Sequence, residues 1–202
     1  MPTMTRHALG TFCWPECATT DAAATKSFYT DLLGWTWNEQ DMGESGKYYM
    51  AQVKGRDVAA MYVLDDRMRA LGIPPHWGSY VSVASADEAA KQAEALGGKV
   101  LMGPFDVGQH GRMAILQDPT GATFCAWQAK EHCGVGMLNE PGSLGWTQLN
   151  TTDTATAKTF YTALLGWTFR DDRDPQGGTY TTFLKSDGAA GGMMAMPPNA
   201  GA

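Results

Sequence analysis

The chain has 202 residues, of which 44% are hydrophobic, and its 15 Lys and Arg against 21 Asp and Glu give a net charge of −6. A chain of this length can bury a hydrophobic core without disulfides or metals. The acidic balance argues against nucleic acid as the main partner, because a phosphate backbone requires clustered Lys and Arg. No apolar run reaches the roughly 20 residues that span a bilayer, and the N-terminal sequence lacks a signal-peptide pattern. We therefore expect a cytoplasmic protein that binds neither nucleic acid nor membrane.

The first predicted elements form a β-α-β-β-β unit. A strand over residues 12–18 places Trp14 and Glu16 on one face, because side chains alternate along a strand. Asp21 then supplies an N-cap for a helix that continues to Leu33, and Gly34 suits the left-handed residue after a helix. Three short strands follow, near 35–38, 47–53 and 57–64. Apolar residues at helical spacing give the helix one apolar stripe: Ala24, Phe28 and Leu32.

An internal repeat extends this unit along the chain. The segment WPECATTDAAATKSFYTDLLGWTW begins at Trp14, and WTQLNTTDTATAKTFYTALLGWTF begins 132 residues later, at Trp146. The region between them reads as a looser version of the same order, with a turn at DPTG (118–121). We therefore predict an α+β fold of three tandem β-α-β-β-β modules. They cover about 10–64, 76–128 and 142–196, and are called the first, second and third modules below.

The four cysteines are Cys13, Cys17, Cys125 and Cys133, and none form a C-x-x-C pair. The separation between Cys17 and Cys125 is too long for a local metal clip. Free cysteine is among the most buried residue types. We expect reduced thiols, most of them buried.

These motifs resemble the vicinal oxygen chelate superfamily, which includes glyoxalases, bleomycin-resistance proteins and extradiol dioxygenases. The resemblance rests on the tandem modules, the D-x-x-x-A-x-x-FY-x-x-LLGW helix and the DPTG hairpin. It is narrowest to glyoxalase-like culture-filtrate antigens and proteins labelled hydroxylases. It implies a glyoxalase-like domain over 1–130, made of two modules, and half of a second such domain over 142–202. Since that subgroup usually has four modules, the third module lacks a mate, and we expect a homodimer through it.

The resemblance also implies a cleft that holds a divalent metal in the enzymes. Such an ion needs three or four converging His, Glu or Asp side chains. The corresponding positions here fall on Trp14, on Ala60 or Met61, on Gly78 and on Cys125. These residue types cannot hold the ion, so we expect no metal and no cofactor, although a non-standard metal site stays open as an alternative.

A metal-free cleft can still bind a ligand. Apolar walls with a few polar groups are typical of small-molecule sites, and indole faces stack on planar ligands. Glu16 is the candidate catalytic acid or base, and Arg112 is a candidate anion anchor at the rim. The competing interpretations are that the aromatic residues fill a collapsed cleft, that Glu16 is solvated or paired with Arg112, and that Arg112 is a surface turn residue. The expected ligand-binding set is Trp14, Glu16, Tyr80, Ser82, Arg112, Cys125 and Trp127.

Three functions remain open at this point. The first is a protein that binds a small aromatic or hydrophobic molecule without metal. The second is an enzyme, either a lyase or isomerase or an oxidoreductase such as a hydroxylase or dioxygenase, that uses Glu16 or a non-standard metal site. The third is a non-catalytic scaffold for association. The fold itself does not choose among them.

Overall fold

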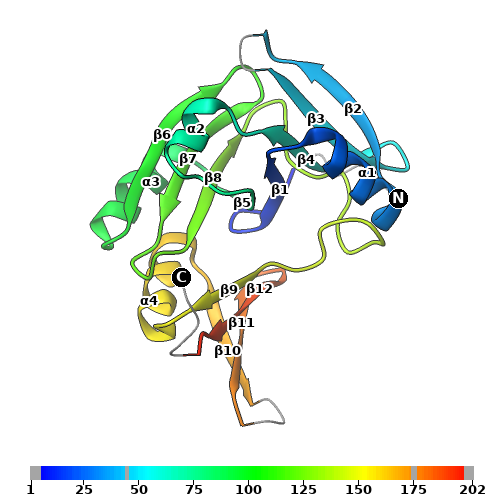
Figure 1. Cartoon of the computed structure of the whole chain (residues 1–202). Coiled ribbons are helices and arrows are strands. Elements are labelled where there is room, and N and C mark those ends of the chain that lie inside the picture. The colour runs from blue at the N-terminus through cyan, green and yellow to red at the C-terminus, as the bar shows by residue number, and fades with distance from the viewer. Residues whose placement is uncertain (1–5, 44–45, 174–176, 198–202) are drawn as a thin grey trace. The chain divides into compact units, whose positions relative to one another are not determined.

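The computed structural model describes residues 6–43, 46–173 and 177–197, and these form twelve strands and four helices (Figure 1). The α+β fold of β-α-β-β-β modules is confirmed. The chain divides into two compact units. The first unit combines Cys13–Ser79 with Cys133–Gly145, and the second combines His7–Phe12, Tyr80–His132 and the chain from Trp146 onward. No helix in the described ranges is long and apolar enough to cross a membrane.

The first unit contains the first module, and its elements follow the predicted order. Its strands lie in the order β2-β3-β4-β1, with β1 parallel to β4 and the other neighbours antiparallel. A short helix, α2 (Asp66–Ala70), follows the sheet. The elements are β1 (Phe12–Thr19), α1 (Ala22–Leu33), β2 (Thr36–Asp41), β3 (Lys47–Val53) and β4 (Arg56–Val63).

Both ends of α1 are capped as the sequence predicts. The Asp21 carboxylate accepts a hydrogen bond from the Ala24 backbone N–H at 2.9 Å, which satisfies one of the free donors of the first turn. Gly34 adopts φ +69° and donates its N–H to the carbonyl of Thr30. Gly34 therefore ends the helix in the left-handed conformation that glycine adopts without strain.

The second unit contains the second module, apart from His76–Ser79 at the start of β5, together with the sheet of the third module. The strands of the second module have the order β5-β8-β7-β6 and carry α3, and the sheet of the third module has the order β10-β11-β12-β9 and carries α4. The elements of the second module are β5 (His76–Ser82), α3 (Ala86–Ala95), β6 (Lys99–Val107), β7 (Gly111–Gln117) and β8 (Thr123–Ala129). Those of the third are β9 (Gln148–Thr151), α4 (Thr154–Leu165), β10 (Thr168–Arg173), β11 (Thr179–Lys185) and β12 (Gly188–Ala195).

The DPTG turn joins these two modules. The carboxylate of Asp118, which is 2% exposed, accepts from the backbone N–H groups of Thr120 and Ala122 and so closes its own turn. Its second oxygen accepts a 3.0 Å hydrogen bond from the Tyr161 hydroxyl of α4. Burial, and next the Asp118 charge, raise the pKa of Tyr161 well above its usual value, so this phenol stays a donor at any physiological pH.

The apolar stripe predicted on the first helix does not face its sheet. Phe28 is 58% exposed and Leu32 is 61% exposed, and α1 has no buried residue. Instead, the neighbouring Tyr29 stacks on Trp35 at the sheet side, with ring centroids 5.1 Å apart. In α4 the residue 132 positions after Phe28 is Phe160, which is 2% exposed and contacts Phe124 of the second module edge to face. The predicted stripe is thus an apolar face of the helix other than the face toward the sheet. Its phenylalanine is buried on α4 and exposed on α1.

This contrast predicts unequal costs for two matched substitutions. Phe160→Ala should lower the free energy of unfolding by about 3–5 kcal/mol, because it leaves a cavity among buried side chains. Phe28→Ala should change that free energy by about 0.5 kcal/mol or less, as exposed positions usually do. Urea unfolding followed by circular dichroism measures both values, and equal losses would show that the Phe28 side of α1 is covered in solution.

Candidate active site

Trp14 and Glu16 lie on the face of the first sheet that α1 does not cover. The strand register places Ala60 beside Glu16 and Met50 beside Ala60. The alternate residues Cys17, Tyr49 and Met61 form a buried cluster with Ala22 at the start of α1, and they therefore define the helix side of the sheet. The expectation that Trp14 and Glu16 share a face is met.

A tyrosine joins Trp14 and Glu16 into one hydrogen-bonded cluster. Tyr48 on β3 donates its hydroxyl proton to the Glu16 carboxylate, with 2.5 Å between Oη and Oε1. The Trp14 indole donates to the same Tyr48 oxygen, with 3.2 Å between Nε1 and Oη. Trp14 is only 4% exposed, and Glu16 is half-buried. We call these three residues the Trp14–Tyr48–Glu16 cluster.

The charge state of this cluster follows from its surroundings. Burial, and next the negative charge of Glu16, raise the pKa of Tyr48 well above its usual value. Tyr48 therefore stays protonated and donates its hydroxyl proton to the Glu16 side-chain oxygen. A carboxylate oriented in this way beside an indole can accept a hydrogen bond from a ligand or take part in proton transfer. Tyr48 was not predicted from the sequence, because the sequences of β1 and β3 do not determine the register between these two strands.

The second unit brings together four other predicted site residues. On β5 and β8, Tyr80 pairs with Cys125 and Ser82 pairs with Trp127, so all four side chains lie on the face opposite α3. The rings of Tyr80 and Trp127 meet edge to face with centroids 6.1 Å apart. The Trp127 indole also donates to the carbonyl of His132 at 2.9 Å. All four residues are between 5% and 7% exposed, so within this unit they behave as packed side chains.

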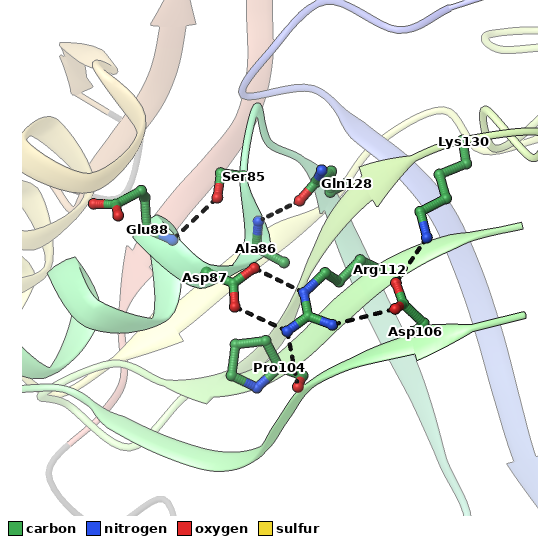
Figure 2. Close-up of polar contacts among 9 residues, drawn as sticks. All are labelled: Ser85, Ala86, Asp87, Glu88, Pro104, Asp106, Arg112, Gln128 and Lys130. Atoms are coloured by element: carbon green, nitrogen blue, oxygen red, sulfur yellow. Dashed lines mark hydrogen bonds and ion pairs between the residues drawn. The ribbon is translucent and has the colours of Figure 1, made fainter. Parts of the chain in front are cut away.

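Arg112 lies on the other face of its sheet, beside α3. Its guanidinium donates two hydrogen bonds to Asp87, at 2.7 and 2.9 Å, and lies 3.5 Å from Asp106 (Figure 2). Lys130 binds the same Asp106 at 2.8 Å. The structure therefore does not place Arg112 with Cys125 and Trp127, and its charge is matched by carboxylates that fix α3 to the strands. The hydrogen bonds lower the pKa of Asp87, chiefly through Arg112, and the pKa of Asp106, chiefly through Lys130.

The N-terminus of α3 is fixed in the same region. The Ser85 hydroxyl accepts from the Glu88 N–H at 3.2 Å and forms the N-cap. The side-chain oxygen of Gln128 accepts from the Ala86 N–H at 3.0 Å, so β8 also holds the first turn (Figure 2). Two side chains thus satisfy two of the four free donors of this helix. The helix start is positioned by side chains from the strand as well as by its own cap.

The Arg112 ion pairs predict a stability difference that depends on pH. Because the pKa values of Asp87 and Asp106 are lowered in the folded protein, their contribution is present above the carboxyl pKa of the unfolded chain, near 4, and is lost as the pH falls through the lowered values. Arg112→Gln should therefore lower the urea midpoint at pH 7, and the gap from the unsubstituted protein should narrow toward pH 3. Urea titrations at the two pH values measure this gap. A gap of constant size would show that Arg112 stabilises the fold by packing.

The positions that hold a metal in enzymes of the expected family do not fit one here. The Trp14 indole nitrogen is a donor already bound to Tyr48, and Ala60 beside Glu16 has no ligand atom. Met61 faces the helix side of its sheet, Gly78 has no side chain, and Cys125 offers a single thiol. Within the described ranges, no group of three His, Cys, Asp or Glu side chains is placed to hold a metal ion.

The third module contains the same kind of tryptophan–tyrosine hydrogen bond. Trp146 stands 132 residues after Trp14, and its indole donates to the Tyr180 hydroxyl at 2.7 Å. A Cβ atom added at Gly192, which stands 132 residues after Ala60, would lie 2.0 Å from that hydroxyl. No ligand side chain can therefore stand at Gly192 while Tyr180 keeps this position. In both modules the tryptophan donates to the hydroxyl of a tyrosine that follows it 34 residues later.

Comparison with known proteins agrees with this architecture. The chain belongs to the Glyoxalase/Bleomycin resistance protein/Dioxygenase superfamily, which matches residues 12–126 and 143–202. It is 36% identical over 198 residues to "Putative glyoxylase CFP32" of Mycobacterium tuberculosis, which covers 98% of this chain and 76% of that protein. It is 37% identical over 173 residues to "Anthracycline biosynthesis protein DauV" of Streptomyces sp. strain C5, covering 81% of this chain and 63% of that protein.

Solved structures show the same fold at low sequence identity. The halotolerant catechol dioxygenase BphC matches with a TM-score of 0.63 at 15% identity, over 94% of this chain and 66% of that one. Homoprotocatechuate 2,3-dioxygenase of Brevibacterium fuscum matches with a TM-score of 0.64 at 15% identity, over 96% and 63%. This chain thus spans just under two thirds of the length of these dioxygenases. The expected superfamily is confirmed, and these structures support the fold alone.

Proposed function

We propose that this protein binds a small aromatic or hydrophobic molecule at the Trp14–Tyr48–Glu16 cluster without a metal. The observation that carries the proposal is the pair of hydrogen bonds that holds a carboxylate and an indole at the position where the superfamily's metal site would begin. Tyr48 orients Glu16, and Glu16 would accept a hydrogen bond from the ligand while the aromatic side chains provide apolar contact. Relatives named as anthracycline biosynthesis proteins support a planar aromatic ligand.

The remaining predicted ligand-binding residues stay proposals. Tyr80, Ser82, Cys125 and Trp127 are packed side by side in the second unit, which supports either a ligand wall or a filled apolar face. The bonding of Arg112 to Asp87 and Asp106 supports a structural role for that residue. The proposal therefore rests on the first unit.

Binding to this cluster is testable with an anthracycline as the probe. Glu16→Gln should weaken binding by roughly 10-fold or more, since a hydrogen bond to a charged group contributes about 1.5–3 kcal/mol. The matched control is Glu39→Gln, because Glu39 pairs with Lys26 on the helix side of the same sheet and should leave affinity unchanged. Tryptophan fluorescence titration gives the affinities. Equal binding by all three proteins would overturn the proposed site.

An enzyme is the second candidate function, favoured by the relative named as a glyoxylase and by the family's dioxygenase members. The reaction would be that of a lyase, isomerase, hydroxylase or dioxygenase, with Glu16 as acid or base. In that case Glu16→Gln would abolish turnover and retain ligand affinity. A non-catalytic scaffold, the third candidate, would show no ligand-induced fluorescence change.

We also propose that two copies associate through the third module. Its Trp146 is 47% exposed and Met194 is 39% exposed, whereas Trp14, at the corresponding position of the first module, is 4% exposed. An isologous dimer would cover these two exposed apolar side chains in both copies. Light scattering should then give about twice the 21.7 kDa chain mass, and Trp146→Ser should shift the mass toward that of one chain. A single-chain mass for the unsubstituted protein would contradict the dimer.

Three further statements remain proposals. The contacts that recur 132 residues apart support an internal repeat of the first and third modules. The family domains would cover 1–130 and 142–202, and the location would be cytoplasmic. The acidic composition supports a protein whose partner is not nucleic acid.

A further inference from the structure

Two cysteines from distant parts of the sequence meet in the first unit. Cys13 lies on β1, and Cys133 begins the segment 133–145 that packs on the same unit. The Val135 N–H donates to the Cys13 carbonyl at 2.8 Å. The backbone at Gly134 is so close to β1 that an added Cβ would lie 2.3 Å from the Cys13 carbonyl oxygen and 3.1 Å from the Cys13 Cβ. Cys133 directly precedes Gly134, and its Cα atom therefore lies about 3.8 Å from the Gly134 Cα atom.

We propose that Cys13 and Cys133 form a reversible disulfide when the protein meets a peroxide. A disulfide needs its two Cα atoms within about 7 Å, and Cys133 directly precedes Gly134, whose backbone packs against Cys13. Cys133 is also one of the groups that raise the pKa of Cys13, after burial. This proposal does not depend on the ligand site.

The two thiols differ in a way that sets the order of reaction. Cys13 is fully buried, whereas Cys133 is half-buried and within reach of solvent. Burial, and to a smaller extent Cys133, raise the pKa of Cys13 to about 12, so its thiolate is scarce at neutral pH. Cys133, which solvent reaches, therefore reacts with the peroxide first.

The reaction balances in two steps. The Cys133 sulfur attacks one oxygen of hydrogen peroxide, the O–O bond breaks, and after proton transfer the products are a sulfenic acid and water. The Cys13 sulfur then attacks the Cys133 sulfur, the S–O bond breaks, and the hydroxyl leaves as water with the proton of the Cys13 thiol. Overall, two thiols are oxidised to one disulfide while one peroxide is reduced to two waters. A small dithiol reverses the change by thiol–disulfide exchange.

The other two cysteines serve as internal controls. Cys17 lies on β1 four residues after Cys13, and its thiol contacts the Ala18 carbonyl. Burial, and next the charge of Glu16, raise the pKa of Cys17. Cys125 is buried in the second unit. Both should stay reduced under conditions that oxidise Cys133.

The experiment counts free thiols in the intact chain. The protein has four cysteines, and treatment with a small excess of hydrogen peroxide should reduce the thiol count after denaturation from four to two. Dithiothreitol should restore four. Mass spectrometry after cleavage at Lys, Arg and Glu should find one cross-linked pair, since cleavage after Glu16 separates Cys13 from Cys17.

Two variants distinguish the pair from other outcomes. Cys133→Ser should keep its three thiols on oxidation, whereas Cys125→Ser should fall from three to one. Both replace a residue other than the fully buried Cys13, so the test does not depend on that site tolerating serine. A count of four after peroxide, a cross-link that includes Cys17 or Cys125, or loss of two thiols from Cys133→Ser would overturn the proposal.

Discussion

In each unit, a hydrogen bond from an indole nitrogen to a glycine carbonyl holds together two segments that are far apart in the sequence. In the first unit, Trp35 donates to the carbonyl of Gly142 at 2.7 Å, and in the second, Trp167 donates to the carbonyl of Gly10 at 3.0 Å. Both glycines have positive φ, +80° and +76°, and an added Cβ at Gly10 would lie 2.9 Å from the Trp167 indole nitrogen. A side chain would therefore be strained at these positions and would crowd the tryptophan at Gly10. The segment that precedes β9 is thus bound by Trp35 of the first module, and the segment that precedes β1 is bound by Trp167 of the third module.

The sequence predicts the elements of this fold well, because they depend on local chemistry. Asp21, Ser85 and Asp153 cap their helices, and Gly34 and Gly166 end two of them in the left-handed conformation. The apolar stripe at Phe28 was harder to interpret. Spacing shows that a face is apolar, but not whether it packs on the sheet or on another helix. Tyr29, one residue on, takes the sheet side here.

The candidate site could be predicted only in part. Strand alternation places Trp14 and Glu16 on one face without any knowledge of partners. The bond between Tyr48 and Glu16 could not be predicted, because it depends on the register of β3 relative to β1 across β4. Arg112 illustrates the opposite problem. It follows a turn, which suggested a rim, but β7 begins at Gly111 and its alternation directs Arg112 toward α3 and Asp87. The position at which β7 starts therefore determines the face toward which the Arg112 side chain points.

Because each unit includes segments from distant parts of the sequence, the chain cannot be cut into two fragments that each contain a complete unit. Each unit is assembled from separate stretches of sequence, so no contiguous fragment contains one unit whole. A fragment ending near residue 130 would lack Gly142 and the acceptor for the Trp35 indole, and one starting near residue 142 would lack Gly10 and the acceptor for Trp167. Each truncated piece would leave the indole donor of a buried tryptophan without its carbonyl acceptor. Recombinant work on this protein therefore needs the two halves on one polypeptide.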